Sequence, residues 1–379
     1  MTDELVLRNA RIVLADEVIT GRLVVRDGLI ADVDDGRSAI GIDLDGDFLI
    51  PGLVELHTDH LESHFSPRPK VRWNPHAALL AHDAQIAASG VTTVLDALRV
   101  GLDEDADLNA DEMRRLADAI DSGVAAGRLR AEHYIHLRCE VSAPDCAQSF
   151  ERFADDPRVR MISLMDHSPG QRQFASLEAY ATYYQGKLKM PDDEFRLFCA
   201  RRMAQSAEFS TRHRAILSAA SRERAIVLAS HDDATRAHVA EAVADGITVA
   251  EFPTTMEAAR ASREAGLAIL MGGPNVVRGG SHSGNVSARS LAEAGMLDII
   301  SSDYIPFSLI QSAFFLGEVV DGISLPRAIA MVTKTPADSI RLQDRGEIAV
   351  GKRADLVRVR IDEHVPVIRS VWRGGDRVA

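Results

Sequence analysis

Short apolar runs alternate with longer amphipathic stretches through the middle of the chain. Eight of these runs have the length and the branched or aromatic side chains that are typical of buried strands. They span residues 49–56, 91–97, 133–139, 159–165, 225–230, 247–251, 267–271 and 298–302. Helical patterns lie between them, for example over residues 76–88, 111–126 and 195–219. Eight strands alternating with helices over roughly 290 residues predict an α/β fold, a (β/α)8 TIM-like barrel, with an open doubly wound sheet as the alternative.

The two ends of the chain have a different pattern, in which short alternating runs are separated by turn pairs such as Asp27-Gly28. These runs span residues 5–14, 18–26 and 29–33 at one end, and residues 346–348, 354–361 and 365–372 at the other. Such ends predict one small β-sandwich domain built from both termini. We therefore expect a composite β-domain of residues 1–50 plus 341–379 and a barrel of residues 51–340. Two separate β-appendages are the alternative.

Composition and charge narrow the class of protein. Of the 379 residues, 46% are hydrophobic and 26% are charged, which is typical of a soluble globular protein. The 43 basic and 56 acidic side chains give a net charge of −13, which argues against a general binder of nucleic acids or anionic membranes. No uncharged apolar run reaches the ~18 residues that a membrane span needs. Three cysteines without a Cys-x-x-Cys pair, and an N-terminus without the pattern of a signal peptide, predict a cytoplasmic location.

Imidazoles and carboxylates close five of the eight predicted strands. In a barrel the active site lies at the carboxyl ends of the strands, so these side chains should meet there. The candidate metal ligands are His57, Asp59, Glu140, His167, His231 and Asp303. Alternation along a strand turns His57 and Asp59 the same way and His60 the other way, but the strand ends there, so His60 stays open as a ligand. Nitrogen and oxygen donors suit Zn²⁺, Mn²⁺ or Fe²⁺.

This ligand set predicts a hydrolytic site with one or two divalent metal ions, Zn²⁺ being the first expectation. Two ions that share a carboxylate would explain why so many ligands are present, and Glu140 is the candidate bridge. A bound metal ion lowers the pKa of water towards neutrality and so supplies a hydroxide nucleophile. Asp303 is the candidate catalytic residue that accepts the proton as the attack proceeds.

A second set of residues is basic and polar and follows closely behind the candidate ligands. Arg68 and Lys70 come after the first barrel strand, and Arg172 comes soon after His167. The segment 272–285 follows the seventh strand and is so rich in Gly and Pro that it is predicted to be a loop rather than a helix. Its glycines allow backbone N–H groups to approach an anion, and its side chains add the donors Arg278, Ser281, His282 and Asn285. Barrels often bind phosphate after strands seven and eight, so we expect a phosphate-bearing ligand here.

Several motifs resemble those of the amidohydrolase superfamily. The run PGLVELH at 51–57 is similar to its first-strand signature, and TPA at 335–337, GEI at 346–348 and GKRADLV at 351–357 are similar to its C-terminal signature. Narrower motifs resemble one family within it, the alpha-D-ribose 1-methylphosphonate 5-triphosphate diphosphatases of the carbon–phosphorus lyase pathway. These are HTD at 57–59, PRP at 67–69, MDHSPGQRQF at 165–174, ASHDDAT at 229–235, the segment 274–285 and SDY at 302–304.

The resemblance extends over nearly the whole chain and implies a specific chemistry. It implies a metal-dependent hydrolase that releases diphosphate from a ribose 5-triphosphate carrying a C1 methylphosphonate, leaving the 5-phosphate, in phosphonate catabolism. The implied partner is this small-molecule substrate, without nucleic acid or membrane, and a homo-oligomer stays open. An amide or lactam hydrolase on the same scaffold is the alternative, although it has no need of a polyanion site. A third hypothesis, a non-catalytic partner in a phosphonate-processing assembly, is disfavoured by the intact metal residues.

Two departures from the family pattern concern the metal ligands. Many superfamily members carry His-x-His on the first strand where this chain has His57-x-Asp59, and the diphosphatases usually have Asn at the position of His60. Asp59, His60 or both therefore remain open as ligands. The superfamily's histidine ligands lie on the fifth and sixth strands, whereas the predicted strands place His167 and His231 on the fourth and fifth. Either the strand count or the ligand set differs.

Overall fold

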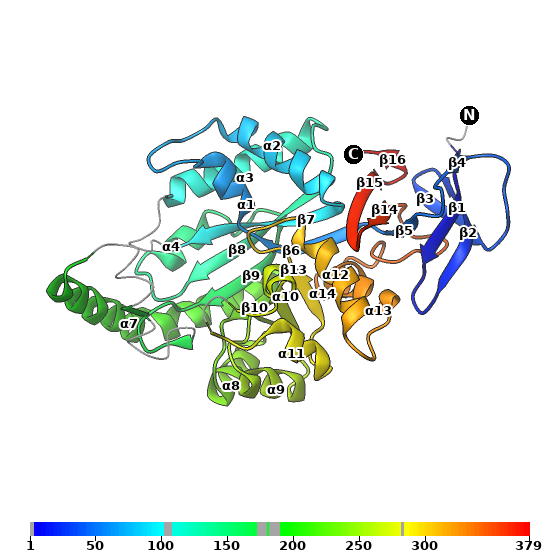
Figure 1. Cartoon of the computed structure of the whole chain (residues 1–379). Coiled ribbons are helices and arrows are strands. Elements are labelled where there is room, and N and C mark those ends of the chain that lie inside the picture. The colour runs from blue at the N-terminus through cyan, green and yellow to red at the C-terminus, as the bar shows by residue number, and fades with distance from the viewer. Residues whose placement is uncertain (1–3, 102–107, 173–179, 182–189, 282–283) are drawn as a thin grey trace.

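The computed structural model describes residues 4–101, 108–172, 180–181, 190–281 and 284–379 (Figure 1). Its centre is a sheet of eight parallel strands in which each strand pairs with the next one along the chain. These strands are β6 (Leu53–Thr58), β7 (Val91–Val100), β8 (Glu132–Glu140), β9 (Val159–Met165), β10 (Val227–His231), β11 (Val249–Glu251), β12 (Ala268–Gly272) and β13 (Ile299–Ser301). All eight predicted barrel strands are present, and the open doubly wound alternative is wrong. The first one, predicted at 49–56, starts later than expected, because Phe48–Pro51 form a strand of the other sheet.

The first and last strands come together and nearly close the sheet into a barrel. Thr58 and Asp303 form an isolated parallel bridge. The Asp59 N–H donates to the Asp303 carbonyl at 3.0 Å, and the Asp303 N–H donates to the His57 carbonyl at 3.1 Å. The buried Glu55 carboxylate accepts the Ser302 N–H at 2.6 Å. This seam places the end of the first strand beside the end of the last.

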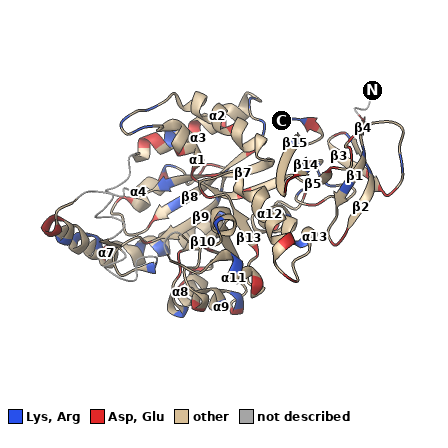
Figure 2. Ribbon diagram, viewed as in Figure 1, with Lys and Arg blue, Asp and Glu red and all other residues tan. Residues whose placement is uncertain are grey.

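Helices cover the outside of the barrel (Figure 1). Those of the described residues are α1 (His60–Phe65), α2 (Pro75–Ala88), α3 (Ala110–Ala125), α4 (Cys146–Glu151), α7 (Asp192–Arg224), α8 (Arg236–Asp245), α9 (Met256–Glu264), α10 (Gly273–Arg278), α11 (Ala288–Glu293), α12 (Ser308–Val319), α13 (Leu325–Ala330) and α14 (Lys334–Ser339). Several begin at a side-chain cap, such as Asn109, which forms a capping box with Glu112. Acidic and basic residues are interspersed on outer helices such as α8 and α9, so these helices present no uniformly negative surface (Figure 2). Among the described helices, none has both the length and the apolar run that crossing a bilayer requires.

The prediction that segment 272–285 is a loop is wrong in its first half, because residues Gly273–Arg278 form helix α10. Pro274 lies in the first turn, where its missing N–H costs no helical hydrogen bond. Gly279 ends the helix in the left-handed conformation, with φ 78°. A Pro at the start and a Gly just past the end are therefore helix boundaries here, and not breakers.

The two ends of the chain form one separate sheet, to the right of the barrel in Figure 1. Its strands are β1 (Glu4–Val13), β2 (Val18–Arg26), β3 (Leu29–Asp34), β4 (Ile42–Asp43), β5 (Phe48–Pro51), β14 (Leu356–Asp362), β15 (Val365–Arg373) and β16 (Asp376–Arg377). Strand β5 pairs antiparallel with β14 and so joins the N-terminal strands to the C-terminal ones. The composite domain is confirmed, and two separate appendages are excluded. The predicted strand at 346–348 is wrong, since these residues form bends and irregular structure. The exact domain boundaries stay a prediction.

Candidate active site

The carboxyl end of β6 and the second residue after β13 bring the first group of ligand atoms together. His57 is buried on β6, and its Nε2 lies 3.7 Å from Oδ1 of Asp59. Asp303 completes the group, since one ligand atom of each of the three residues lies within 4.8 Å of the others. One imidazole and two carboxylates facing one another form a donor set for a divalent cation.

A second group lies at the ends of β9 and β10. His231 ends β10, and its Nε2 lies 3.5 Å from Oδ2 of Asp232. The His167 Nε2 lies 3.7 Å from the same oxygen. The ligand atoms of these three residues also lie within 4.8 Å of one another. His167 therefore follows the fourth barrel strand and His231 ends the fifth, so the predicted strand count is confirmed.

Glu251, the last residue of β11, lies between the two groups. Its Oε1 is 3.1 Å from Nδ1 of His57, and its Oε2 is 3.2 Å from Nδ1 of His231. A carboxylate can only accept, so Nδ1 of each histidine donates a hydrogen bond to Glu251. Nε2 of each histidine faces an aspartate. Burial raises the pKa of Glu251, but the neighbouring His136 and His57 outweigh it and hold that pKa well below its usual range. The His57 and His231 rings are stacked with their centroids 5.8 Å apart, so the two groups are neighbours.

Glu140 lies behind His167. Its Oε2 is 2.7 Å from Nδ1 of His167, and its Oε1 accepts the His167 backbone N–H at 3.1 Å. Burial would lower the pKa of His167, but Glu140 and Asp232 outweigh it and raise that pKa to about 10. The Arg202 guanidinium lies 3.7 Å from the same carboxylate. The structure therefore places Glu140 where it fixes the orientation of an imidazole, rather than between the two groups.

Arg138, on β8, contacts the first group from the side. Its guanidinium donates to both carboxylate oxygens of Asp59 at 2.7 Å. Burial raises the pKa of Asp59, but Arg138 outweighs burial and lowers it to about 2. Asp303 differs, because burial dominates there and raises its pKa. One carboxylate of the group is thus firmly ionised while the other binds a proton more readily.

His60 does not lie with His57. It begins helix α1 and belongs to a different group of side chains, with His64 and His82. Asp59 lies with His57 and Asp303, whereas His60 lies with His64 and His82. Which of Asp59 and His60 binds a metal ion stays a prediction.

The residues predicted to bind phosphate have different surroundings. Arg172 is only 4% exposed; its guanidinium pairs with Asp233, and also with Glu241 at 2.8 Å. Protein carboxylates thus occupy two of its nitrogens, and its contact with a phosphate stays a prediction. Arg68, Lys70 and Arg278 are exposed, Ser281 and Asn285 are half-buried, and His282 lies outside the described residues.

Sequence reasoning missed three residues of this site. Arg138 and Glu251 lie within predicted strands, whereas the candidate ligands come after the predicted strand ends. Asp232 lies in the ASHDDAT motif at 229–235, where the sequence alone does not distinguish it from its neighbour Asp233. Charged side chains at the barrel-facing positions of buried strands are the signal that points to Arg138 and Glu251, because an unpaired charge is rarely buried.

The chain belongs to the amidohydrolase family, whose sequence profile matches residues 84–379. It is 47% identical over 378 residues to the alpha-D-ribose 1-methylphosphonate 5-triphosphate diphosphatase of Escherichia coli strain K12, covering 99% of this chain and 100% of that protein. Solved structures with the same fold include an N-acetylglucosamine-6-phosphate deacetylase from Pasteurella multocida, with a TM-score of 0.62, 14% identity and 99% of each chain covered. A 5-methylcytosine deaminase from Klebsiella pneumoniae matches with a TM-score of 0.63 and 14% identity, covering 99% of this chain and 98% of that one. The predicted superfamily and fold are confirmed.

Proposed function

We propose that this protein hydrolyses alpha-D-ribose 1-methylphosphonate 5-triphosphate to the 5-phosphate and diphosphate. The observation that carries the proposal is the 47% identity to the Escherichia coli diphosphatase over the full length of both chains. The two neighbouring groups of candidate metal ligands at the barrel mouth support it. Hydrolysis of a phosphoanhydride requires negative charge to be neutralised at the reacting phosphorus and on the leaving diphosphate, and bound cations would do this.

The two groups at the barrel mouth fit divalent metal ions. Their imidazole nitrogens and carboxylate oxygens suit Zn²⁺ first, and Mn²⁺ or Fe²⁺ next. The surrounding carboxylates raise the pKa of His57 and His167, so the pocket favours positive charge, which a cation would supply in place of protons. We assign one position to His57, Asp59 and Asp303 and a second to His167, His231 and Asp232. A metal ion there supplies Lewis-acid polarisation and an acidified water.

The residues of the chain have separate roles in this proposal. Asp303, whose pKa is raised by burial, accepts the proton of the attacking water. Glu251 fixes the rings of His57 and His231, and Glu140 fixes the ring of His167. We therefore reassign Glu140 from the predicted bridge to an orienting role of the kind that carboxylates commonly have behind histidine ligands.

The outer phosphates and the phosphonate need cations that protein carboxylates do not occupy. Exposed Arg68, Lys70 and Arg278 are our candidates, with Ser281, His282 and Asn285 as further donors. Helix α10 starts at Gly273, directly after the β12 residue Gly272; a Cβ built on Gly272 would lie 3.5 Å from Oδ2 of Asp303. The segment that carries Arg278 thus leaves the barrel beside the candidate catalytic residue.

Substitution of Arg278 tests the anion site. A guanidinium makes two parallel hydrogen bonds to a phosphate, which an ammonium cannot reproduce. Arg278→Lys should lower kcat/KM on the triphosphate by about 10- to 150-fold, the equivalent of one charge-assisted bond. Metal content should be unchanged. Arg289→Lys is the matched control, because Arg289 is exposed on the next helix, α11, and forms an ion pair with Glu293. Wild-type efficiency in Arg278→Lys would remove Arg278 from the site.

To test the function, the purified, metal-loaded protein is mixed with alpha-D-ribose 1-methylphosphonate 5-triphosphate, and the products are measured by ³¹P NMR. Diphosphate and the ribose 5-phosphate product should appear in equal amounts. In ¹⁸O-water the label should enter only the 5-phosphate product, because attack at the α-phosphorus leaves diphosphate as the leaving group. Label in diphosphate alone would refute attack at that phosphorus. Turnover of amides or lactams with no turnover of the triphosphate would favour the alternative hydrolase.

A further inference from the structure

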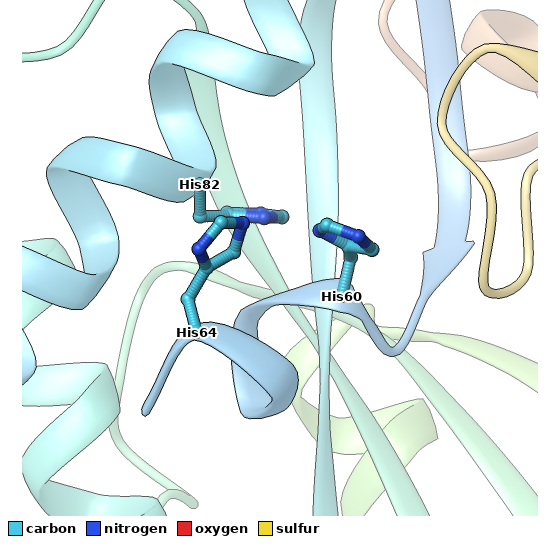
Figure 3. Close-up of side chains that lie close together, drawn as sticks. All are labelled: His60, His64 and His82. Carbon is cyan, nitrogen blue, oxygen red and sulfur yellow. The ribbon is translucent and has the colours of Figure 1, made fainter. Parts of the chain in front are cut away.

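Three histidines come together in a group that shares no residue with the candidate active site. His60 and His64 lie on α1 and His82 lies on α2, and their rings converge between the two helices (Figure 3). One ring nitrogen of each lies within 4.8 Å of the others. We propose that this group, here the tri-histidine site, binds one divalent transition-metal ion in addition to any ion at the barrel mouth.

His82 is held as metal-binding histidines are held. It is fully buried, and its Nε2 lies 2.7 Å from Oδ1 of Asp96. The other oxygen of Asp96 lies 2.7 Å from Nδ1 of His133, which fixes the carboxylate in turn. Because the carboxylate accepts from Nε2, the lone pair of the neutral ring is on Nδ1. That atom is buried and has no hydrogen-bond partner among the described residues.

His60 and His64 complete the set from the other helix. Nδ1 of His60 is also buried without a partner in the described part of the chain. His64 is four residues further along and so lies on the same helical face. Its Nε2 lies 3.2 Å from Oε1 of Gln85, an acceptor, which leaves the lone pair of the ring on Nδ1. Simple packing of the three rings would leave two buried nitrogens unsatisfied, whereas one ion satisfies them together.

The donor set defines the class of ion. Three imidazoles without a thiolate or a carboxylate suit Zn²⁺, Co²⁺, Ni²⁺ or Cu²⁺, and not Mg²⁺ or Ca²⁺, which require oxygen ligands. Three protein ligands leave a fourth position of a tetrahedral ion for water. His60 and His64 are only half-buried, so an ion can reach the site from solvent.

The position of the site gives the ion a structural effect. Helix α1 has six residues and begins directly after Asp59, its N-cap, which lacks a side-chain capping hydrogen bond. An ion held by both helices would fix α1 against α2. The tri-histidine site is independent of the proposed function, since neither its ligands nor its test involves the substrate.

Metal stoichiometry tests the site. Metal-free wild type, His64→Gln and His60→Asn are dialysed against excess Zn²⁺, freed of loose ions, and analysed for zinc per chain. His76→Gln, on α2 but exposed and outside the group, is the matched control. Wild type and His76→Gln should hold one ion more than either His64→Gln or His60→Asn. The rise in Tm that Zn²⁺ causes should shrink in those two variants, while their metal-free Tm stays near that of the wild type.

Equal zinc content in all four proteins would overturn the proposal. Two independent ligand variants are included so that failure of one to fold leaves the other as the test. A His231→Gln background separates this site from the barrel mouth, because the additional loss of one ion on His64→Gln should persist there. A protein that hydrolyses no triphosphate but still shows this loss would contradict the proposed function and support the tri-histidine site.

Discussion

Asp303 lies where the last barrel strand ends, and its backbone is in the left-handed region, with φ 57°. Few residues other than Gly, Asn and Asp adopt this conformation readily, so asparagine preserves the backbone there. Asp303→Asn removes the proton acceptor and should lower kcat by about 10²- to 10⁴-fold. Steady-state kinetics on the triphosphate measure the loss, and Asp321→Asn, at an exposed turn, is the control. A rate within threefold of the wild type, with unchanged metal content, would show that another group takes the proton.

In the proposed function Glu251 acts through the two histidines that it contacts, His57 and His231. In Glu251→Gln the amide can still accept one imidazole N–H, but its NH₂ group opposes the second. We expect metal affinity to fall by about 10- to 100-fold, as for other partners behind metal ligands. Competition with a chelator measures the affinity, and Glu293→Gln, on the exposed face of α11, is the control. Unchanged affinity together with unchanged thermal stability would mean that the histidines do not need this carboxylate.

The candidate metal ligands that sequence reasoning identified all lie within two residues of the carboxyl end of a strand. Asp232 and Asp233 show the limit of that reasoning. They are adjacent in the chain, yet the first lies with His167 and His231 while the second pairs with Arg172. Strand alternation cannot separate them, because Asp232 leaves the strand geometry with φ 58°. The buried pairing of Arg172 likewise depends on a carboxylate far away in the sequence, and no local pattern reveals it.

At the scale of elements, the period of apolar residues predicted all eight barrel strands and the three helices that were named. Its failures are at short segments, where few residues carry the period. Helix α10 has six residues and is flanked by glycines, so its composition is that of a loop. The helix packs closely against α12, since a Cβ added at Gly273 would lie 2.5 Å from Oγ of Ser308, and no local pattern reveals this contact.

Helix α7 ends in an unfavourable conformation. Its C-cap, Ala225, has φ 54°, which is in the left-handed region. Helix α8 also ends in this region, but its C-cap is a glycine, Gly246. An L-residue in this conformation destabilises the folded state by about 1–2 kcal/mol. Glycine removes this strain, but its more flexible unfolded chain offsets about 0.4–1 kcal/mol of the gain. Ala225→Gly should therefore raise the free energy of unfolding by about 0.5–1 kcal/mol in urea titrations. Ala265→Gly is the control, because the α9 C-cap has φ −83° and should gain nothing. A loss of stability in Ala225→Gly would contradict the argument.

At the scale of the whole molecule, the pattern at both termini predicted a joint β-domain but not how it attaches to the barrel. One attachment is a cluster of charges that no local pattern brings together. Glu132, on β8, pairs with Arg345 at 2.5 Å and with Arg353, both from the segment that leads into the C-terminal strands. The Arg345 guanidinium also donates to Thr93 Oγ1 on β7 at 3.0 Å. The cluster ties the C-terminal segment to two barrel strands.

Glu132 should make this attachment dependent on pH. Partial burial would raise its pKa, but the Tyr134 hydroxyl and the two arginines outweigh burial and lower the pKa from 4.5 to about 2. A carboxyl with a depressed pKa stabilises the fold fully above its unfolded pKa, and this stabilisation is lost as the pH falls towards the folded value.

Glu132→Gln should therefore reduce the free energy of unfolding of the metal-free protein by about 1–3 kcal/mol at pH 7. The difference from wild type should shrink steadily between pH 4.5 and pH 3. Urea titrations at each pH measure it, with Glu151→Gln, exposed on α4, as the control. A difference that stays constant down to pH 3 would assign the loss to packing and not to the charge of Glu132.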